Sequence, residues 1–101
     1  MAWVYILECA DGTYYVGSTT DLERRVSQHQ LGEGAAYTRL RRPVRLLWSA
    51  QFDRVDEAFA FEKRVQGWSR RKREALMEGR FEVLPRLASR SWAARQERGE
   101  V

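Results

Sequence analysis

Five side chains in this sequence are suited to attack on a phosphodiester. Two tyrosines, Tyr5 and Tyr15, precede Arg25 and the chain's only histidine, His29. An arginine can bind a phosphate through a forked pair of N–H donors, and a histidine can transfer protons near neutral pH. Further along, Glu62 is a carboxylate among apolar positions, where a metal ion would explain its presence. These residue types together indicate metal-assisted phosphoryl chemistry.

The two tyrosines must be brought together by a β-hairpin. We expect its strands at residues 3–9 and 13–17 and its turn at residues 10–12. A two-residue loop would place Tyr5 and Tyr15 on opposite faces. A three-residue loop with Gly12 in the left-handed conformation instead pairs Tyr15 with Leu7, on the face that carries Tyr5. Glycine at the third loop position favours this second register.

A helix is expected to position the arginine and the histidine. Thr20 and Glu23 have the spacing of a capping box, which predicts a helix over about residues 21–31. Arg25 and His29 are one turn apart on that helix, so they lie together at the edge of its packed face. Glycines after the helix end it, and an arginine-rich loop is expected to follow.

The rest of the chain predicts one further strand and two further helices. Apolar and polar residues alternate from 44 to 52, as in a half-buried strand. Asp53 is the expected N-cap of a helix over about residues 54–67, and Ser69 that of a helix ending at Gly79. The predicted fold is α+β, a small three-stranded antiparallel sheet flanked by helices. It occupies residues 1–85, and residues 86–101 form a C-terminal tail or short helix.

Two tripeptides relate these residues to a known family. Trp3-Val4-Tyr5 and Tyr15-Val16-Gly17 stand where the GIY-YIG nuclease superfamily has its two signature tripeptides. Over roughly residues 3–84 the chain resembles this superfamily, most of all its stand-alone bacterial single-domain (YhbQ-like) group. Two departures are clear. Trp3 replaces the first glycine, and the chain has no asparagine, although many members carry a late active-site asparagine.

The resemblance implies a role for each of the five side chains. Tyr5 is implied to be the general base toward water, and Tyr15 to position the phosphate or the water. Arg25 is implied to clamp the scissile phosphate, and His29 to position the phosphate or protonate the leaving oxygen. Glu62 is implied to bind Mg²⁺ or Mn²⁺, hard ions that favour oxygen ligands.

Four of these residues also have a plain structural interpretation. Either tyrosine could be an aromatic strand residue that fills the core, and His29 could be a hydrogen-bonded helix histidine. Glu62 could be an ordinary helix glutamate that pairs with Lys63 or Arg64. The set as a whole favours catalysis over these alternatives.

The charge distribution favours nucleic acid as the partner. The formal net charge is +4, and residues 39–73 carry eleven basic and four acidic side chains. Such a stripe is typical of nucleic-acid binding, although it could also be a solvated surface. The residues expected to contact phosphates are Arg39, Arg41, Arg42, Arg45, Arg70, Arg71, Lys72 and Arg73.

Composition excludes several other classes. The first apolar run, about Tyr5, is too short to span a membrane and has no basic lead, so we expect a soluble, cytoplasmic protein. A single cysteine excludes an internal disulfide, and one cysteine with one histidine does not favour a structural zinc site.

The sequence therefore predicts a metal-dependent endonuclease acting on DNA, with RNA left open. Selectivity is expected to come from strand structure or from a protein partner, and sequence specificity to be low. The alternative is a catalytically weak nucleic-acid-binding module on the same scaffold. A purely structural protein would leave the five side chains unexplained.

Overall fold

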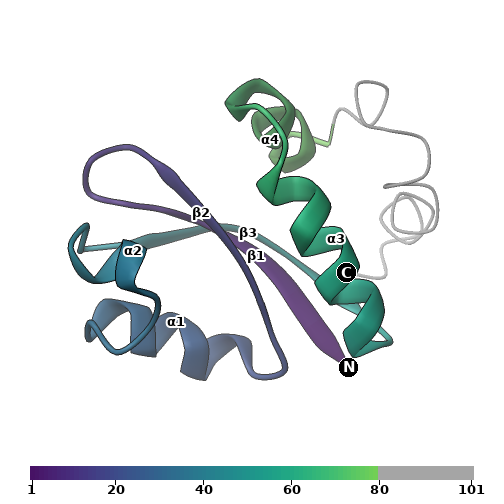
Figure 1. Ribbon diagram of the computed structural model, residues 1–101, viewed down its shortest axis with the longest axis horizontal. Helices are drawn as coiled ribbons and strands as arrows, with labels where there is room; N and C mark the ends of the chain where they lie inside the picture. Colours follow the sequence, from purple (N-terminus) through teal and green to yellow (C-terminus); the bar gives the residue numbers. More distant parts are fainter. Residues whose placement is uncertain (80–101) are drawn as a thin grey trace.

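The computed structural model describes residues 1–79. In chain order its elements are β1 (Ala2–Glu8), β2 (Tyr14–Thr19), α1 (Leu22–Gln30), α2 (Ala36–Arg39), β3 (Arg45–Phe52), α3 (Val55–Gln66) and α4 (Arg70–Met77) (Figure 1). The α+β class predicted from the sequence is confirmed. The predicted C-terminal tail at 86–101 lies outside the described residues. No helix within residues 1–79 is long and apolar enough to cross a membrane.

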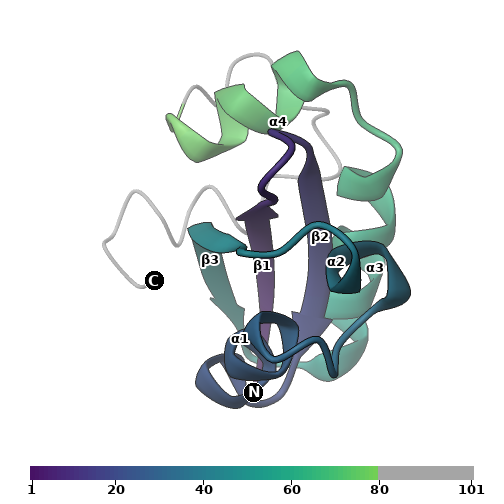
Figure 2. The same cartoon turned by 90° about the vertical axis from the view of Figure 1, so that its left-hand side faces the viewer.

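The three strands form one antiparallel sheet in the order β2-β1-β3, with β1 in the middle (Figure 2). Tyr15 pairs with Leu7 and Gly17 with Tyr5, which is the predicted hairpin register. Gly12 has φ of 84°, the left-handed conformation that the three-residue loop requires. The hairpin prediction is therefore confirmed, and both tyrosines lie on one face.

Helices cover both faces of the sheet. Figure 1 shows α3 and α4 on one side and α1 and α2 on the other. Val4 and Ile6 of β1 pack in the same cluster as Phe61 and Val65 of α3. Their neighbour Tyr5 points to the opposite face, because successive side chains of a strand alternate. The tyrosine face of the sheet is thus the one covered by α1 and α2.

Two predicted helix caps are wrong by one residue. Asp21, and not Thr20, is the N-cap of α1, and its Oδ1 accepts the N–H of Arg24 at 3.2 Å. A carboxylate at this position also interacts favourably with the positive end of the helix dipole. Arg54 occupies the N-cap position of α3 in place of Asp53, without a side-chain cap hydrogen bond. The Ser69 cap of α4 is confirmed, because its Oγ accepts the N–H of Lys72 at 3.2 Å.

The predicted loop before β3 and the alternation within β3 are also corrected. The loop contains the four-residue helix α2, whose Thr38 is buried. In β3 the pairing with β1 shifts between Ile6 and Leu7, as at a β-bulge. Because a shift of one residue moves side chains to the other face, Val44 packs in the tyrosine-face cluster while Ala50 packs against α3.

Candidate active site

Tyr5 is buried beneath the second strand of the hairpin. Its side chain is 1% exposed, and Gly17 lies directly opposite it in the register. A Cβ added at Gly17 would lie 2.6 Å from Tyr5 Cζ and closer still to the hydroxyl oxygen. The glycine of the second tripeptide is therefore required by the tyrosine of the first, since any side chain there would displace the hydroxyl.

The Tyr5 hydroxyl is the first member of a buried hydrogen-bonded chain. It lies 2.9 Å from Nε2 of His29, and His29 Nδ1 lies 2.7 Å from the hydroxyl of Thr38. Thr38 in turn donates to the carbonyl oxygen of Ala35 at 3.0 Å. A threonine hydroxyl has one hydrogen, so Thr38 accepts from Nδ1–H, which leaves Nε2 unprotonated. Tyr5 therefore donates its hydrogen to Nε2.

Gly34 makes room for this arrangement. A Cβ at Gly34 would lie 2.5 Å from His29 Nδ1. His29 itself has no exposed surface. Because both ring nitrogens are engaged and the ring is enclosed, His29 is placed to exchange a proton with Tyr5 and does not face solvent.

Burial is the main cause of the shifted pKa values of Tyr5 and His29. Burial raises the pKa of Tyr5 to about 12, although a hydrogen bond and the positive charge of Arg25 oppose the rise. Burial, followed by the charge of Arg25, lowers the pKa of His29 to about 4. At neutral pH the histidine is therefore uncharged, and it can act as a proton acceptor.

Tyr15 and Arg25 complete the cluster on the tyrosine face. The Tyr15 ring centroid lies 6.5 Å from that of Tyr5 and 5.2 Å from that of His29. Its ring also stacks on Tyr37, with centroids 6.0 Å apart and planes at 29°. Arg25 donates through Nη1 to Gln28 Oε1 at 3.2 Å, and it forms no ion pair with another of residues 1–79.

Arg25 lines a hollow at the end of β2. The hollow has a volume of about 440 Å³ and is bordered by Ser18, Thr19, Thr20, Asp21, Arg24, Arg25 and Gln28. Arg25 also acts on the buried Tyr5 hydroxyl, because it opposes the rise that burial causes in the pKa of Tyr5. A phosphate oxygen in this hollow would thus meet a guanidinium that is within electrostatic range of Tyr5.

Glu62 reaches the same strand from the other face of the sheet. It is 8% exposed, and its Oε1 accepts the hydroxyl of Ser18 at 2.5 Å while Oε2 accepts the amide of Gln66 at 2.6 Å. Lys63 Nζ is 4.0 Å from Oε2, at the limit of an ion pair. The Glu62 charge raises the pKa of both Tyr5 and Tyr15, so the carboxylate is within electrostatic range of the tyrosines.

The carboxylate oxygens of Glu62 suit a hard divalent cation that keeps several waters as ligands. A carboxylate has about four lone-pair positions, so two accepted hydrogen bonds leave oxygens able to bind a cation. No group of three His, Cys, Asp or Glu residues that could hold a metal occurs within residues 1–79. One carboxylate, with waters and substrate phosphate as the other ligands, is a common way for proteins to hold Mg²⁺. The residues present therefore fit that ion.

The structure thus brings four predicted residues together and places the fifth across a strand. Tyr5, Tyr15, Arg25 and His29 lie on the α1 side of the sheet, whereas Glu62 lies on the α3 side. The edge strand β2 separates them. Ser18 links the two sides, because it bonds Glu62 and lines the hollow that contains Arg25.

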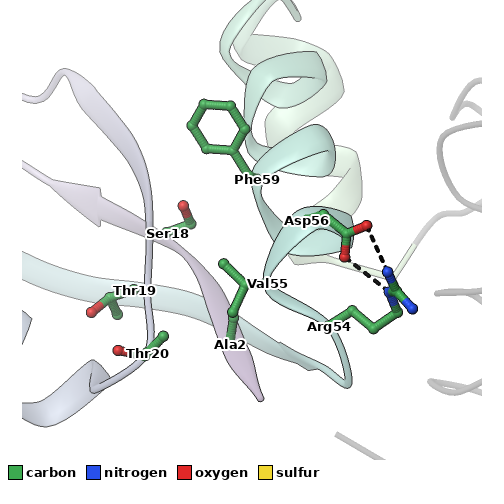
Figure 3. A pocket seen from close by; sticks show the side chains of 8 residues that line it. All are labelled: Ala2, Ser18, Thr19, Thr20, Arg54, Val55, Asp56 and Phe59. Carbon is green, nitrogen blue, oxygen red and sulfur yellow. Dashed lines mark hydrogen bonds and ion pairs between the residues drawn. The ribbon is translucent and has the colours of Figure 1, made fainter.

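A second, more apolar hollow adjoins Ser18. It has a volume of about 700 Å³ and lies between the end of β2 and the start of α3 (Figure 3). Phe59, which is 53% exposed, and Val55 form its α3 wall. Arg54 and Asp56 form an ion pair of 3.0 Å at its border. None of the five predicted site residues lines this hollow.

Most residues of the predicted basic stripe already have partners within the protein. Three form ion pairs with carboxylates, and these are Arg41 with Asp11 at 3.1 Å, Arg45 with Glu8 at 2.6 Å and Arg70 with Glu74 at 3.2 Å. Arg42 and Arg73 donate to backbone carbonyls. Arg39, Arg71 and Lys72 form no ion pair with another of residues 1–79. Their binding to phosphate remains a prediction.

Sequence patterns alone did not identify several side chains that hold the site together. Thr38 and Gly34 set the position of His29, and Ser18 and Gln66 orient the Glu62 carboxylate. Gln66 could have been found, because it lies one helical turn after Glu62. Thr38 and Ser18 contact residues far along the chain, so no local spacing indicates them.

The comparisons with known proteins identify the family of this chain. Residues 1–75 match the GIY-YIG catalytic domain. The chain belongs to the GIY-YIG family. A UPF0213 protein of Halobacterium salinarum is 51% identical over 76 residues, which cover 75% of this chain and 99% of that protein. A UPF0213 protein of Streptococcus pneumoniae is 41% identical over 90% of this chain and 93% of its own length.

A solved structure of the same group supports the fold. The solution NMR structure of a UPF0213 protein from Bacillus halodurans is 48% identical and covers 77% of this chain and 84% of that one, with a TM-score of 0.51. The relatives place this GIY-YIG protein in the stand-alone, YhbQ-like group, as its sequence predicted. The GIY-YIG domain is a nuclease domain, so its substrates are nucleic acids, and nucleases of this family generally use divalent metal ions.

Proposed function

We propose that this GIY-YIG protein is a metal-dependent endonuclease that hydrolyses phosphodiester bonds in DNA. The single observation that carries the proposal is the hydrogen bond from the Tyr5 hydroxyl to the unprotonated Nε2 of His29, near Arg25, which pairs with no carboxylate of residues 1–79. A hydroxyl whose proton has a ready acceptor can itself take a proton from an attacking water. An arginine at the same place binds the phosphate that this water attacks.

The proton path runs from water through Tyr5 to His29. With a pKa of about 12, Tyr5 is protonated at neutral pH and cannot act as a base on its own. It can do so while it passes its own proton to His29 Nε2. Arg25 disfavours a proton on His29, but a bound phosphate offsets the arginine's positive charge and makes protonation of His29 easier. Substrate binding therefore promotes the base function of the pair.

This mechanism changes the role that the resemblance implied for His29. Because His29 is enclosed and both of its nitrogens are engaged, it is assigned the Tyr5 proton and not the leaving oxygen. Thr38 fixes the tautomer that makes Nε2 the acceptor. Arg25 binds the scissile phosphate as charge builds up on it, and Tyr15, in contact with both rings, keeps that phosphate in line.

Glu62 would hold the divalent ion, with Ser18 and Gln66 fixing the direction of its carboxylate. When bound, Mg²⁺ supplies positive charge that stabilises the phosphate and the departing oxygen. The phosphate contacts proposed for Arg25 carry no sequence information. Selectivity is therefore expected to depend on the shape or strandedness of the DNA.

One observation favours the alternative of a catalytically weak nucleic-acid-binding module. Tyr5 is 1% exposed, so a water can reach its hydroxyl only if the residues that cover it move. A protein in which that movement does not occur would still bind phosphates through its arginines. The two proposals differ in the outcome of a cleavage assay.

The test is cleavage of single-stranded, duplex, nicked and branched DNA with Mg²⁺ or with a chelator. The nuclease proposal predicts cleavage of at least one substrate, only with the metal, and its loss in Glu62→Gln. Glu62→Gln preserves the size of the side chain and can still accept a hydrogen bond from Ser18. Cleavage that persists in the variant would contradict the role of Glu62, and no cleavage by the parent of any substrate would favour the binding module.

A further inference from the structure

Arg73 is a partly buried cation that pairs with no carboxylate in the described part of the chain. Burial lowers the pKa of its guanidinium, which is the direction expected for a charge removed from water. Carboxylates neutralise Arg41, Arg45 and Arg70 in ion pairs. Arg73 differs from these arginines because no carboxylate of residues 1–79 neutralises its charge.

The protein fixes this guanidinium in one orientation. Its Nε donates to the carbonyl of Val65 at 3.1 Å and its Nη2 to the carbonyl of Gln66 at 2.7 Å, both at the end of α3. A guanidinium has five N–H donors. The hydrogen bonds found among the described residues leave Nη1 without an acceptor. Capping α3 accounts for two donors but not for the rest of the group.

Arg73 faces a cleft that adjoins the proposed active site. The cleft has a volume of about 330 Å³ and is lined by Tyr14, Tyr15, Val16, Tyr37, Gln66 and Arg73. One wall carries Tyr15, which contacts Tyr5 and His29. Another carries Gln66, whose amide bonds Glu62. An anion held here would lie next to both halves of the active site.

A second arginine without an ion pair among residues 1–79, Arg25 of α1, lines a hollow further along β2. The cleft of Arg73 borders β2 at residues 14–16, and the hollow of Arg25 borders it at residues 18–20 and just beyond. Arg25 and Arg73 therefore mark two anion positions along the edge of β2, and Tyr15 lines the cleft that contains Arg73. A nucleic-acid strand that runs along β2 would bring one phosphate to each of these positions.

We propose that Arg73 and the cleft between β2 and the end of α3 bind a second phosphate of the substrate strand, one position away from the scissile phosphate at Arg25. The proposal rests on the proposed function for the position of the scissile phosphate. It defines a path for the strand along β2. It also predicts that a ligand with two linked phosphates binds better than inorganic phosphate.

The test compares Arg73→Gln with Arg64→Gln in binding to a fluorescent single-stranded 12-mer of thymidine, by anisotropy with a chelator present. Arg64 is an exposed arginine of α3 outside the cleft, so its variant removes the same formal charge. Loss of hydrogen bonds to a charged group costs about 1.5–3 kcal/mol, so Arg73→Gln should weaken binding by about tenfold or more. Arg64→Gln should weaken it by less. Equal losses, or none in Arg73→Gln, would overturn the proposal.

Thermal melting accompanies both variants, because Arg73→Gln also loses its contacts with α3. A measurement on the parent protein covers the case in which that variant unfolds. In NMR titrations, the dinucleotide pTpT should shift the Arg73 Nε–H and Gln66 side-chain amide signals and bind more tightly than inorganic phosphate. Unmoved signals, or equal affinities for the two ligands, would contradict the two-phosphate path.

These experiments need no cleavage, so their outcome separates the two proposals. Binding that depends on Arg73 in a protein that never cuts DNA would support the phosphate position and refute the nuclease. If the parent protein cleaves DNA but Arg73→Gln binds DNA as tightly as the parent, the nuclease proposal is supported and the phosphate position at Arg73 is refuted.

Discussion

At the scale of single residues, the two signature tripeptides act on each other. A side chain at position 17 would overlap Tyr5, and a side chain at position 34 would overlap His29, so Gly17 and Gly34 leave the space that these rings occupy. The departure at Trp3 leaves this contact intact, because the glycine that matters to Tyr5 is across the hairpin. Gly17 and Gly34 are thus needed because a side chain packs directly against each of them, and not because of their backbone conformation.

Gly17→Ala tests that contact. The added methyl group would overlap the Tyr5 ring, so the free energy of unfolding should fall by about 1–3 kcal/mol. Gly67→Ala is the matched control, since its nearest neighbour would be 3.5 Å away and its backbone is helical. That change should be neutral or stabilise by up to about 1 kcal/mol. Urea unfolding of both variants measures the difference, and equal effects would contradict the close approach.

His29 predicts a pH dependence of stability. Its pKa is about 4 in the folded protein, below the ordinary value of 6.5, so the unfolded chain binds more protons between these values. Stability should be complete above pH 6.5 and fall as the pH drops toward 4. Urea unfolding at pH 7 and pH 5 should show the loss, and His29→Gln should remove most of it. A loss of the same size in that variant would assign it to other groups.

At the scale of secondary structure elements, much was predictable from local pattern. The hairpin register followed from a glycine at the third loop position, and the start of α4 followed from Ser69. The errors arose where two residues could serve one role. Thr20 and Asp21 can both cap a helix, and the carboxylate of Asp21 is the one that does so.

Features that depend on distant contacts could not be predicted in this way. The short helix α2 has no side-chain cap, yet it supplies Thr38 to the buried histidine. The bulge in β3 appears only in its pairing with β1. The five site residues came from the family resemblance, whereas the partners that orient them come from elements far apart in the chain.

Helix α4 includes two residues of the predicted basic stripe, Arg71 and Lys72, whose contacts with phosphate can be tested. Arg71 and Lys72 are exposed and form no ion pair with another of residues 1–79, whereas Glu74 already pairs with Arg70. Replacing Arg71 and Lys72 by alanine should flatten the slope of log affinity against log salt by about one unit for each lost phosphate contact. Arg70→Ala should change the slope less. Equal slopes for the parent and the double variant would place α4 off the DNA surface.

At the scale of the whole molecule, the sheet separates two halves of the proposed active site. The α1 and α2 side would supply the proposed proton path and phosphate clamp, and the α3 side would supply the proposed metal-binding carboxylate. The edge strand β2 is the place where both can reach one phosphate. Burial is the main cause of the raised pKa of both tyrosines, and the Glu62 charge adds to it although the sheet lies between them.

The most direct test of this account is the single-turnover cleavage rate of Tyr5→Phe with Mg²⁺, on whichever DNA the parent cuts. The variant keeps the buried ring and removes only the hydroxyl that bonds His29. The account predicts a rate about 10²–10⁴-fold below that of the parent, with DNA binding retained and a folded protein by thermal melting. A variant that cuts as fast as the parent would show that the Tyr5 hydroxyl is not the base.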